Sequence, residues 1–334
     1  MDHPREDAEL LSTARALAAR GAWEEVRALL AAAQGPAPGS AEPALLLAEA
    51  RLRLGEPAGA LALLDQSIPA LVRAGDRPAY RRAVNLQGAA RFELGDLAGA
   101  EESFARALEL GNVEGDALLV ARATNNLGAI ANIRGRREAA LTLYQLAVPA
   151  YQRIGSAVGL AESYHNMAIT YRDARQLERA DEYESRAIEF AREAGSARLL
   201  AMARAGRAEL SLLRGDARLA DAGASMAAQE YGAIPDPVGE ADALRLVGAA
   251  RAARGEVENA LRALDRALGL AHEHGSVLIE AEALRTRAEL HRAVGRSAEA
   301  RADADAARAI FDRLGADEER DAVERLLASL PLIS

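Results

Sequence analysis

The chain has 334 residues and a formal net charge of −9; 50% of its residues are hydrophobic and only 4% are aromatic. It contains no cysteine, which excludes disulfide bonds, thiol nucleophiles and thiolate metal sites. The acidic balance argues against nucleic acid as the main partner, because neutralising phosphates requires a basic face. Abundant alanine and leucine suit close helix packing and argue against a β-rich fold, so we expect an all-α protein.

The start of the chain carries no targeting pattern. Residues 1–9 are acidic and polar, with no apolar run after a basic start, so we expect no signal peptide. No apolar run elsewhere approaches the length of a membrane span. These features predict a cytoplasmic protein without a membrane partner.

Residues 1–34 predict a short N-terminal helix pair, which is split at Gly21. The pair is either a terminal cap or a repeat of ordinary length, because Gly21 and Gly55 are 34 residues apart. Trp23 follows the split, where a buried ring is expected to seal the end of a helix stack. Residues 35–43, GPAPGSAEP, contain three prolines and two glycines and predict a loop.

Two interleaved series of chain breaks repeat every 40 residues through the rest of the chain. Each break of the second series except the last, Gly315, is followed by Asp or Ser. A glycine ends a helix, and the Asp or Ser side chain accepts a hydrogen bond from the free amides of a new one. The first series is Gly55, Gly95, Gly135, Arg175, Gly215, Gly255 and Gly295, and the second is Gly75, Gly115, Gly155, Gly195, Pro235, Gly275 and Gly315. A fixed period of this size indicates stacked helix pairs.

Residues 44–315 therefore predict seven repeats of 40 residues, each an antiparallel helix pair. The pairs are expected at about 42–74, 76–114, 116–154, 156–194, 196–232, 236–274 and 276–314. First helices carry one small residue, and second helices carry a larger residue between two alanines, so that the next helix packs into a groove. The small residues are Gly88, Gly128, Ala168, Ala208, Gly248 and Ala288; the larger ones are Phe104, Tyr144 and Leu264, with Glu184, Ala224 and Ala304 as exceptions.

The fifth of these pairs departs most from the pattern. Its second helix has Gly223 and Ala224 where bulk is expected, and it ends in the segment 233–237, AIPDP, which cannot continue a helix.

Residues 316–334 predict one amphipathic capping helix and a tail. Val323, Leu326, Leu327 and Leu330 form its apolar stripe, and seven charged residues face the other way. The stripe is expected to close the last repeat. The alternative is that this helix is a self-association element or a ligand for the chain's own groove.

The chain resembles the tetratricopeptide repeat family over roughly residues 5–315, and the usual repeat of that family has about 34 residues. The longer repeat, with Asn-Leu-Gly at 126–128 and Asn-Met-Ala at 166–168, is similar to the Pins/LGN and kinesin light chain branch. Residues 307–315, ARAIFDRLG, are similar to the ends of repeat arrays attached to bacterial transcription regulators. The resemblance implies a right-handed α-solenoid of about eight repeats that binds a protein or peptide in its concave face.

No arrangement of residues predicts catalysis, a cofactor or a metal site. His272 and His274 are two residues apart near a helix end, a spacing that points them to different sides. Paired carboxylates on helix surfaces are ordinary solvated charges, and no phosphate loop or nucleophile motif is present. We therefore expect a protein that is not an enzyme.

The candidate binding residues follow from the resemblance, which places the first helix of each pair on the concave face. Carried over to this chain, the groove is lined by Arg82, Asn85, Arg122, Asn125, Asn126, Asn132, His165, Asn166, Ile169 and Arg172, with Glu209, Arg245 and Arg285 in later repeats. Asparagine costs a helix about 0.5 kcal/mol relative to alanine, so five asparagines in consecutive first helices require an explanation. Either their amides bind the backbone of a peptide, or they bridge adjacent first helices and hold the array together.

Charge suggests the chemistry of the ligand. Residues 121–160 contain five arginines and one glutamate, a net charge of +4 within an acidic protein. Arginines at the groove would bind carboxylates through two parallel hydrogen bonds. The sequence thus predicts a non-enzymatic scaffold or adaptor for an acidic or carboxylate-bearing segment. The alternatives are a ligand-sensing regulator of a partner enzyme or transcription factor, and a structural protein that forms homo-oligomers.

Overall fold

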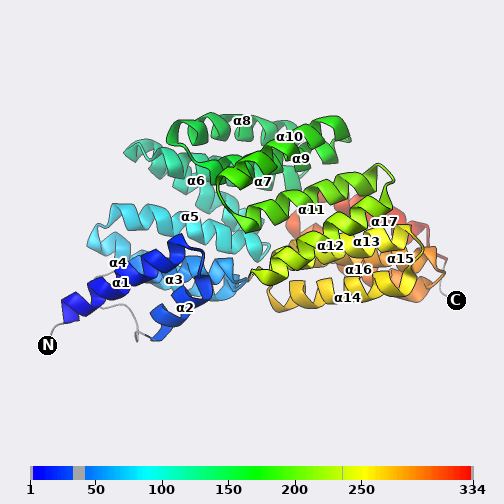
Figure 1. Cartoon of the computed structure of the whole chain (residues 1–334), viewed down its shortest axis with the longest axis horizontal. Helices are drawn as coiled ribbons and strands as arrows, with labels where there is room; N and C mark the ends of the chain where they lie inside the picture. The colour runs from blue at the N-terminus through cyan, green and yellow to red at the C-terminus, as the bar shows by residue number, and fades with distance from the viewer. Residues whose placement is uncertain (1–2, 33–41, 235, 332–334) are drawn as a thin grey trace. The chain divides into compact units, whose positions relative to one another are not determined.

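The computed structural model describes residues 3–32, 42–234 and 236–331, which form seventeen α-helices and no strand (Figure 1). The helices are α1 His3–Ala19, α2 Trp23–Ala32, α3 Glu42–Arg53, α4 Pro57–Ala74, α5 Arg77–Glu93, α6 Leu97–Glu114, α7 Ala117–Ile133, α8 Arg137–Ile154, α9 Ala157–Asp173, α10 Leu177–Glu193, α11 Ala197–Leu213, α12 Ala217–Ala233, α13 Pro237–Ala253, α14 Val257–Glu273, α15 Val277–Ala293, α16 Ser297–Leu314 and α17 Asp317–Ala328. Residues 35–41 of the expected loop and Pro235 lie outside the described residues. The fold is an all-α solenoid of helix pairs, as predicted.

The chain breaks lie where the 40-residue period puts them, because each needs a left-handed backbone. Every glycine of the two series has a positive φ, between 61° and 85°. Arg175, which replaces glycine once, has a φ of 59° and is the one described non-glycine residue with a positive φ. Most of the following Asp and Ser side chains cap the next helix; for example, Asp76 accepts a hydrogen bond from the amide of Ala79 at 3.1 Å. Ser276 does not form this bond.

Packing within a pair follows the predicted contact between a small and a bulky side chain. A Cβ atom added to Gly128 would lie 2.5 Å from the ring of Tyr144, and one added to Gly88 would lie 2.6 Å from the ring of Phe104. Both aromatic rings are buried, with 1% of their surface exposed. The absence of a Cβ therefore lets each second helix seat its ring against the backbone of the first.

By its contacts the chain divides into two compact units, residues 1–123 and 124–334, and the division falls inside α7. Unit 1 has a core of alanine and leucine side chains, with one cluster around Val26 and Leu46 and another around Leu64 and Leu71. Trp23 is half-buried and packs against the first of these clusters. Among the described residues, no helix is both long and apolar enough to cross a membrane.

Unit 2 ends in the single helix α17, which packs on α16. Val323, Leu326 and Leu330 of its apolar stripe are buried, and Leu327 is half-buried. On the other side of α17, Asp317, Asp321 and Glu324 are exposed, whereas Glu319 is half-buried.

Candidate functional site

An ion-pair network connects the first helices of four successive pairs in unit 2: α9, α11, α13 and α15. Arg172 of α9 pairs with Glu209 of α11. The other carboxylate oxygen of Glu209, Oε1, lies 3.6 Å from Nη2 of Arg245 on α13. Nε of Arg245 lies 3.2 Å from Oε2 of Glu282 on α15. The four residues alternate in charge and are 36 or 37 positions apart, so each first helix turns the same face to the next. We call them the inner network.

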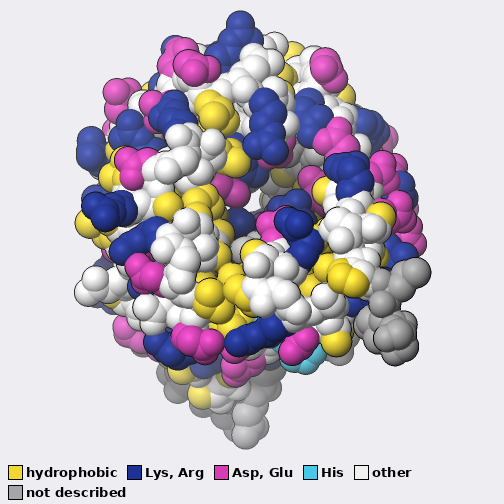
Figure 2. Space-filling view, turned by 90° about the vertical axis from the view of Figure 1, so that its right-hand side faces the viewer, with side chains coloured by type: hydrophobic (Ala, Val, Ile, Leu, Met, Phe, Trp, Pro, Cys, Tyr) yellow, Lys and Arg dark blue, Asp and Glu magenta, His cyan; other side chains and the backbone are white. Residues whose placement is uncertain are grey.

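The inner network is held in a poorly solvated place. Only 7% of the Arg245 side chain is exposed, compared with 19% to 23% for the other three. On the side of the molecule that carries α13 to α16, the surface is hollowed, and basic and acidic side chains are visible in the hollow (Figure 2). Charges this far from water are costly unless they are paired, and here each is paired.

The charge states of the network reflect a balance between burial and attraction. Burial opposes the ionised form of Glu209, but attraction by Arg172 and Arg245 outweighs it, and the pKa of Glu209 is lowered. For Glu282 burial wins, and its pKa is raised despite Arg245. Burial also opposes the charged guanidiniums of Arg172 and Arg245, yet their carboxylate partners raise the pKa of both.

His165 lies beside this network and is bonded to a buried carboxylate. Its Nδ1 is 2.9 Å and 3.1 Å from the two oxygens of Glu184, a residue that is 1% exposed. A Cβ atom at Gly206 would lie 1.6 Å from Glu184 Oε1, so the carboxylate occupies space that only glycine leaves open. This explains why Glu184 interrupts the series of bulky residues on second helices.

The predicted asparagines differ in burial and in bonding. Asn125 is 4% exposed, and its Oδ1 accepts a hydrogen bond from Ser163 Oγ at 2.8 Å and a long one from Asn166 Nδ2 at 3.5 Å. Asn132 donates to Asp173 at 3.0 Å, also linking α7 to α9. Asn125 is therefore a bridge between first helices and is withdrawn from ligand, whereas Asn126 and Asn166 are half-buried.

Three of the predicted groove residues, Arg82, Asn85 and Arg122, belong to unit 1. Arg82 pairs with Glu49 of α3, and Asn85 is half-buried with its Oδ1 unbonded. Arg122 is exposed. The other seven belong to unit 2, where Ile169 is half-buried on α9, and the site is built from unit 2.

Sequence reasoning named Glu209 but missed the carboxylates of Glu184 and Glu282. Glu282 shares its position in the repeat with Asp242 and Arg122, and Glu184 shares its position with Tyr144. The four residues of the inner network are 36 or 37 positions apart in a period of 40, so they lie at four different repeat positions and a search at any one position would not have found them.

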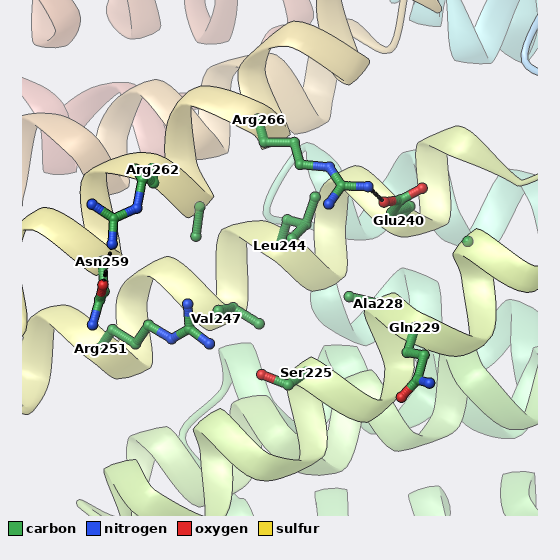
Figure 3. Close-up of a pocket in the computed structure, with 12 residues that line it drawn as sticks. Ser225, Ala228, Gln229, Glu240, Leu244, Val247, Arg251, Asn259, Arg262 and Arg266 are labelled. Atoms are coloured by element: carbon green, nitrogen blue, oxygen red, sulfur yellow. Dashed lines mark hydrogen bonds and ion pairs between the residues drawn. The ribbon is translucent and has the colours of Figure 1, made fainter.

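A second candidate surface of unit 2 is a recess of about 510 Å³ between α12, α13 and α14 (Figure 3). Its floor is apolar, from Leu244, Val247 and Ala263, and it opens because Ala228 stands where other second helices carry a large apolar side chain. The larger residues at this repeat position are Ile68, Leu108, Val148, Ile188 and Leu268.

The rim of the recess is basic, but its charges are mostly satisfied within the chain. Arg251 lies 3.1 Å from Asp221, and Arg266 pairs with Glu240. Among the described contacts, Arg262 bonds only the neutral amide of Asn259. The recess therefore offers little uncompensated charge to a ligand.

Comparison with known proteins gives a family match for part of the chain. Residues 119–193 match the model of the tetratricopeptide repeat. No curated protein sequence matches the chain.

Solved structures share the fold at low sequence identity. The Rap protein complexed with Competence and Sporulation Factor has a TM-score of 0.64 at 15% identity, and the match covers 97% of each chain. A chain of the APC/C hetero-tetramer Cut9-Hcn1 has a TM-score of 0.65 at 15% identity, and the match covers 96% of this chain and 55% of that one. A signal transduction ATPase of Pyrococcus horikoshii with a tetratricopeptide repeat sensor has a TM-score of 0.56 at 17% identity, over 85% of this chain and 43% of that one. The tetratricopeptide repeat match thus covers residues of α7 to α10, and the solved structures share the helix-pair fold of the described chain.

Proposed function

We propose that the chain is a non-enzymatic binding protein, and that the first helices of unit 2 hold a peptide segment of its partner. The contact residues are Asn126, His165, Asn166, Ile169 and Arg172, with the rest of the inner network continuing the surface. Amide side chains offer a donor and an acceptor to a peptide backbone, and Ile169 offers an apolar contact.

The inner network is the observation that carries this proposal. Elsewhere in unit 2 the helices pack mainly through alanine, leucine and tyrosine side chains, and ion pairs such as Arg251 with Asp221 and Arg266 with Glu240 each join only two helices. Buried ion pairs contribute little net stability, so a row of four across successive first helices is better explained by recognition. Its alternating charges are already fixed in position, which lowers the entropy cost of binding.

The structural neighbours support a binding role for the fold. The Rap structure holds Competence and Sporulation Factor, and the Pyrococcus horikoshii protein uses its repeats as a sensor. At these identities the likeness concerns the fold, so the ligand of this chain must be found directly.

Selection from a display library of random dodecapeptides tests the proposal. Peptides enriched on the wild-type chain are then titrated into an Asn166→Ala, Arg172→Gln double variant by calorimetry. We expect the dissociation constant to rise at least tenfold. Arg218→Gln is the matched control, because Arg218 is exposed on α12, away from the first helices; it should bind as the wild type does. Equal affinity for the double variant and the wild type would remove these residues from the site.

A further inference from the structure

The acidic first turn of α17 contacts a turn 180 positions earlier in the chain. Arg137, at the start of α8, donates from Nη1 to Glu318 Oε1 at 2.7 Å, and its Nη2 bonds the other oxygen of the same carboxylate. A Cβ atom added to Gly135 would lie 3.1 Å from Glu318 Oε1. Glu318 therefore lies directly against the α7–α8 turn, within unit 2.

The next residue, Glu319, lies near charged residues of two first helices. It is half-buried; burial raises its pKa, while Arg285 of α15 attracts the carboxylate and Asp173 of α9 repels it. Arg285 and Asp173 stand on the first helices that carry the inner network. Two adjacent carboxylates of α17 thus occupy one edge of the candidate ligand surface.

The fit between α17 and this edge is incomplete. Glu319 Oε2, Asn132 Oδ1 and Arg137 Nε are all buried without a hydrogen-bond partner. The pair between Arg137 and Glu318 is partly solvated, with 24% and 47% of the two side chains exposed. Unbonded buried polar atoms are costly and solvated ion pairs are weak, so the contact of α17 is weak enough for a carboxylate of another molecule to replace it.

The rest of α17 is held differently. Its buried Val323, Leu326 and Leu330 attach it to the end of the solenoid independently of the acidic turn. The acidic first turn of α17 can therefore separate from the α7–α8 turn while the rest of α17 stays packed on α16.

We propose that the α7–α8 turn and Arg285 of α15 together form a binding site for two adjacent carboxylates of an acidic peptide, and that Glu318 and Glu319 are its resident occupants. A bidentate arginine is matched to a carboxylate, and residues 121–160 carry a net charge of +4. An acidic partner enters by displacing the chain's own turn. The claim that this site binds a ligand rests on the proposed function. The claim that the first turn of α17 contacts the α7–α8 turn does not.

A distance measurement tests the resident contact. Because the chain has no cysteine, Ala139→Cys on α8 and Asp317→Cys in the acidic first turn of α17, both exposed, provide a unique pair of spin labels. Double electron–electron resonance should give a narrow distance distribution in this background. Arg137→Glu should broaden it, and adding Glu318→Arg should restore it.

Arg153→Glu is the matched control, because it makes the same charge change at an exposed position of α8. It should leave the distribution narrow. A distribution that Arg137→Glu does not alter would overturn the proposed contact.

A second measurement tests exchange with an external peptide. The probe is a fluorescent peptide of residues 316–331, ADEERDAVERLLASLP, titrated by fluorescence anisotropy. It should bind the full chain carrying Glu318→Gln and Glu319→Gln at least tenfold more tightly than the wild type, and Arg137→Glu in that background should abolish the gain. If the peptide binds the wild type and the Glu318→Gln, Glu319→Gln variant equally, Glu318 and Glu319 do not occupy the site. This result is independent of whether substitutions at Asn166 and Arg172 weaken binding of the library peptides.

Discussion

His165 and Glu184 form a buried pair in which Nδ1 lies 2.9 Å from the carboxylate, and Glu184 takes the repeat position at which Phe104, Tyr144 and Leu264 stand in other repeats. The pair joins the second helix α10 to the candidate ligand surface on α9. A histidine beside a buried carboxylate has its ring orientation set, so His165 presents its remaining edge in a defined direction.

The pair predicts a pH-dependent stability. Burial raises the pKa of Glu184, although His165 and the arginines Arg172 and Arg207 lower it in part. The folded chain then holds the proton more tightly than the unfolded one, so the stabilising contribution is present below the ordinary pKa and is lost as pH rises through the raised value.

Glu184→Gln removes this titration. From about pH 4 to about pH 8, the free energy of unfolding of the variant should rise relative to the wild type. Urea denaturation at several pH values measures the difference. A difference that stays constant or falls over this range would contradict the raised pKa.

Arg175 predicts a gain in stability. Its left-handed backbone costs a non-glycine residue about 1–2 kcal/mol, and glycine offsets part of the gain through its greater freedom when unfolded. Arg175→Gly should stabilise the fold by about 0.5–1 kcal/mol, measured by thermal or chemical denaturation. Gly215→Ala is the converse substitution, because Gly215 has a φ of 85° and no atom lies within 4 Å of the added Cβ. It should lose about 1 kcal/mol, and equal stability of the two variants would argue against backbone strain.

Gly128 tests how closely the helices of a pair pack. Gly128→Ala puts a methyl group 2.5 Å from the Tyr144 ring, and we expect a loss of about 1–3 kcal/mol. Adding Tyr144→Ala reproduces the small pairing of Ala288 with Ala304 in the last repeat. The two losses should therefore be less than additive in a double-mutant cycle, whereas strict additivity would place the ring elsewhere.

Substitutions of Asn125 and Asn126 test which asparagine stabilises the fold and which binds a ligand. Asn125→Ala removes the acceptor of Ser163 Oγ in a buried place and should cost about 1–3 kcal/mol of stability. Asn126→Ala should change stability by less than about 0.5 kcal/mol and weaken binding of the selected peptides instead. Denaturation and calorimetry on both variants check this. The reverse pattern would return Asn125 to the ligand surface.

The helices were predictable because each boundary has a local cause. A left-handed glycine followed by a capping Asp or Ser marks a break whatever surrounds it, and even Arg175 takes the backbone that its place in the period requires. The contact of Gly128 with Tyr144 was also accessible, since small and bulky residues recur at fixed repeat positions.

The site was less predictable because its contacts depend on how the pairs stack. Repeat position places Asn125 and His165 alike, yet Asn125 is buried as a bridge to Ser163 and His165 is bonded to Glu184. The contact of Arg137 with Glu318 joins residues 181 positions apart and depends on the curvature of unit 2, which no local pattern records.

Photo-crosslinking most directly tests whether ligands bind on the first helices of unit 2. A benzoylphenylalanine is placed at Ile169 on α9 or, as the matched control, at Leu219, which is 58% exposed on the second helix α12. Peptides selected on the wild-type chain should crosslink at position 169 and not at position 219. Crosslinking at position 219 alone would show that the ligand surface lies on the second helices instead.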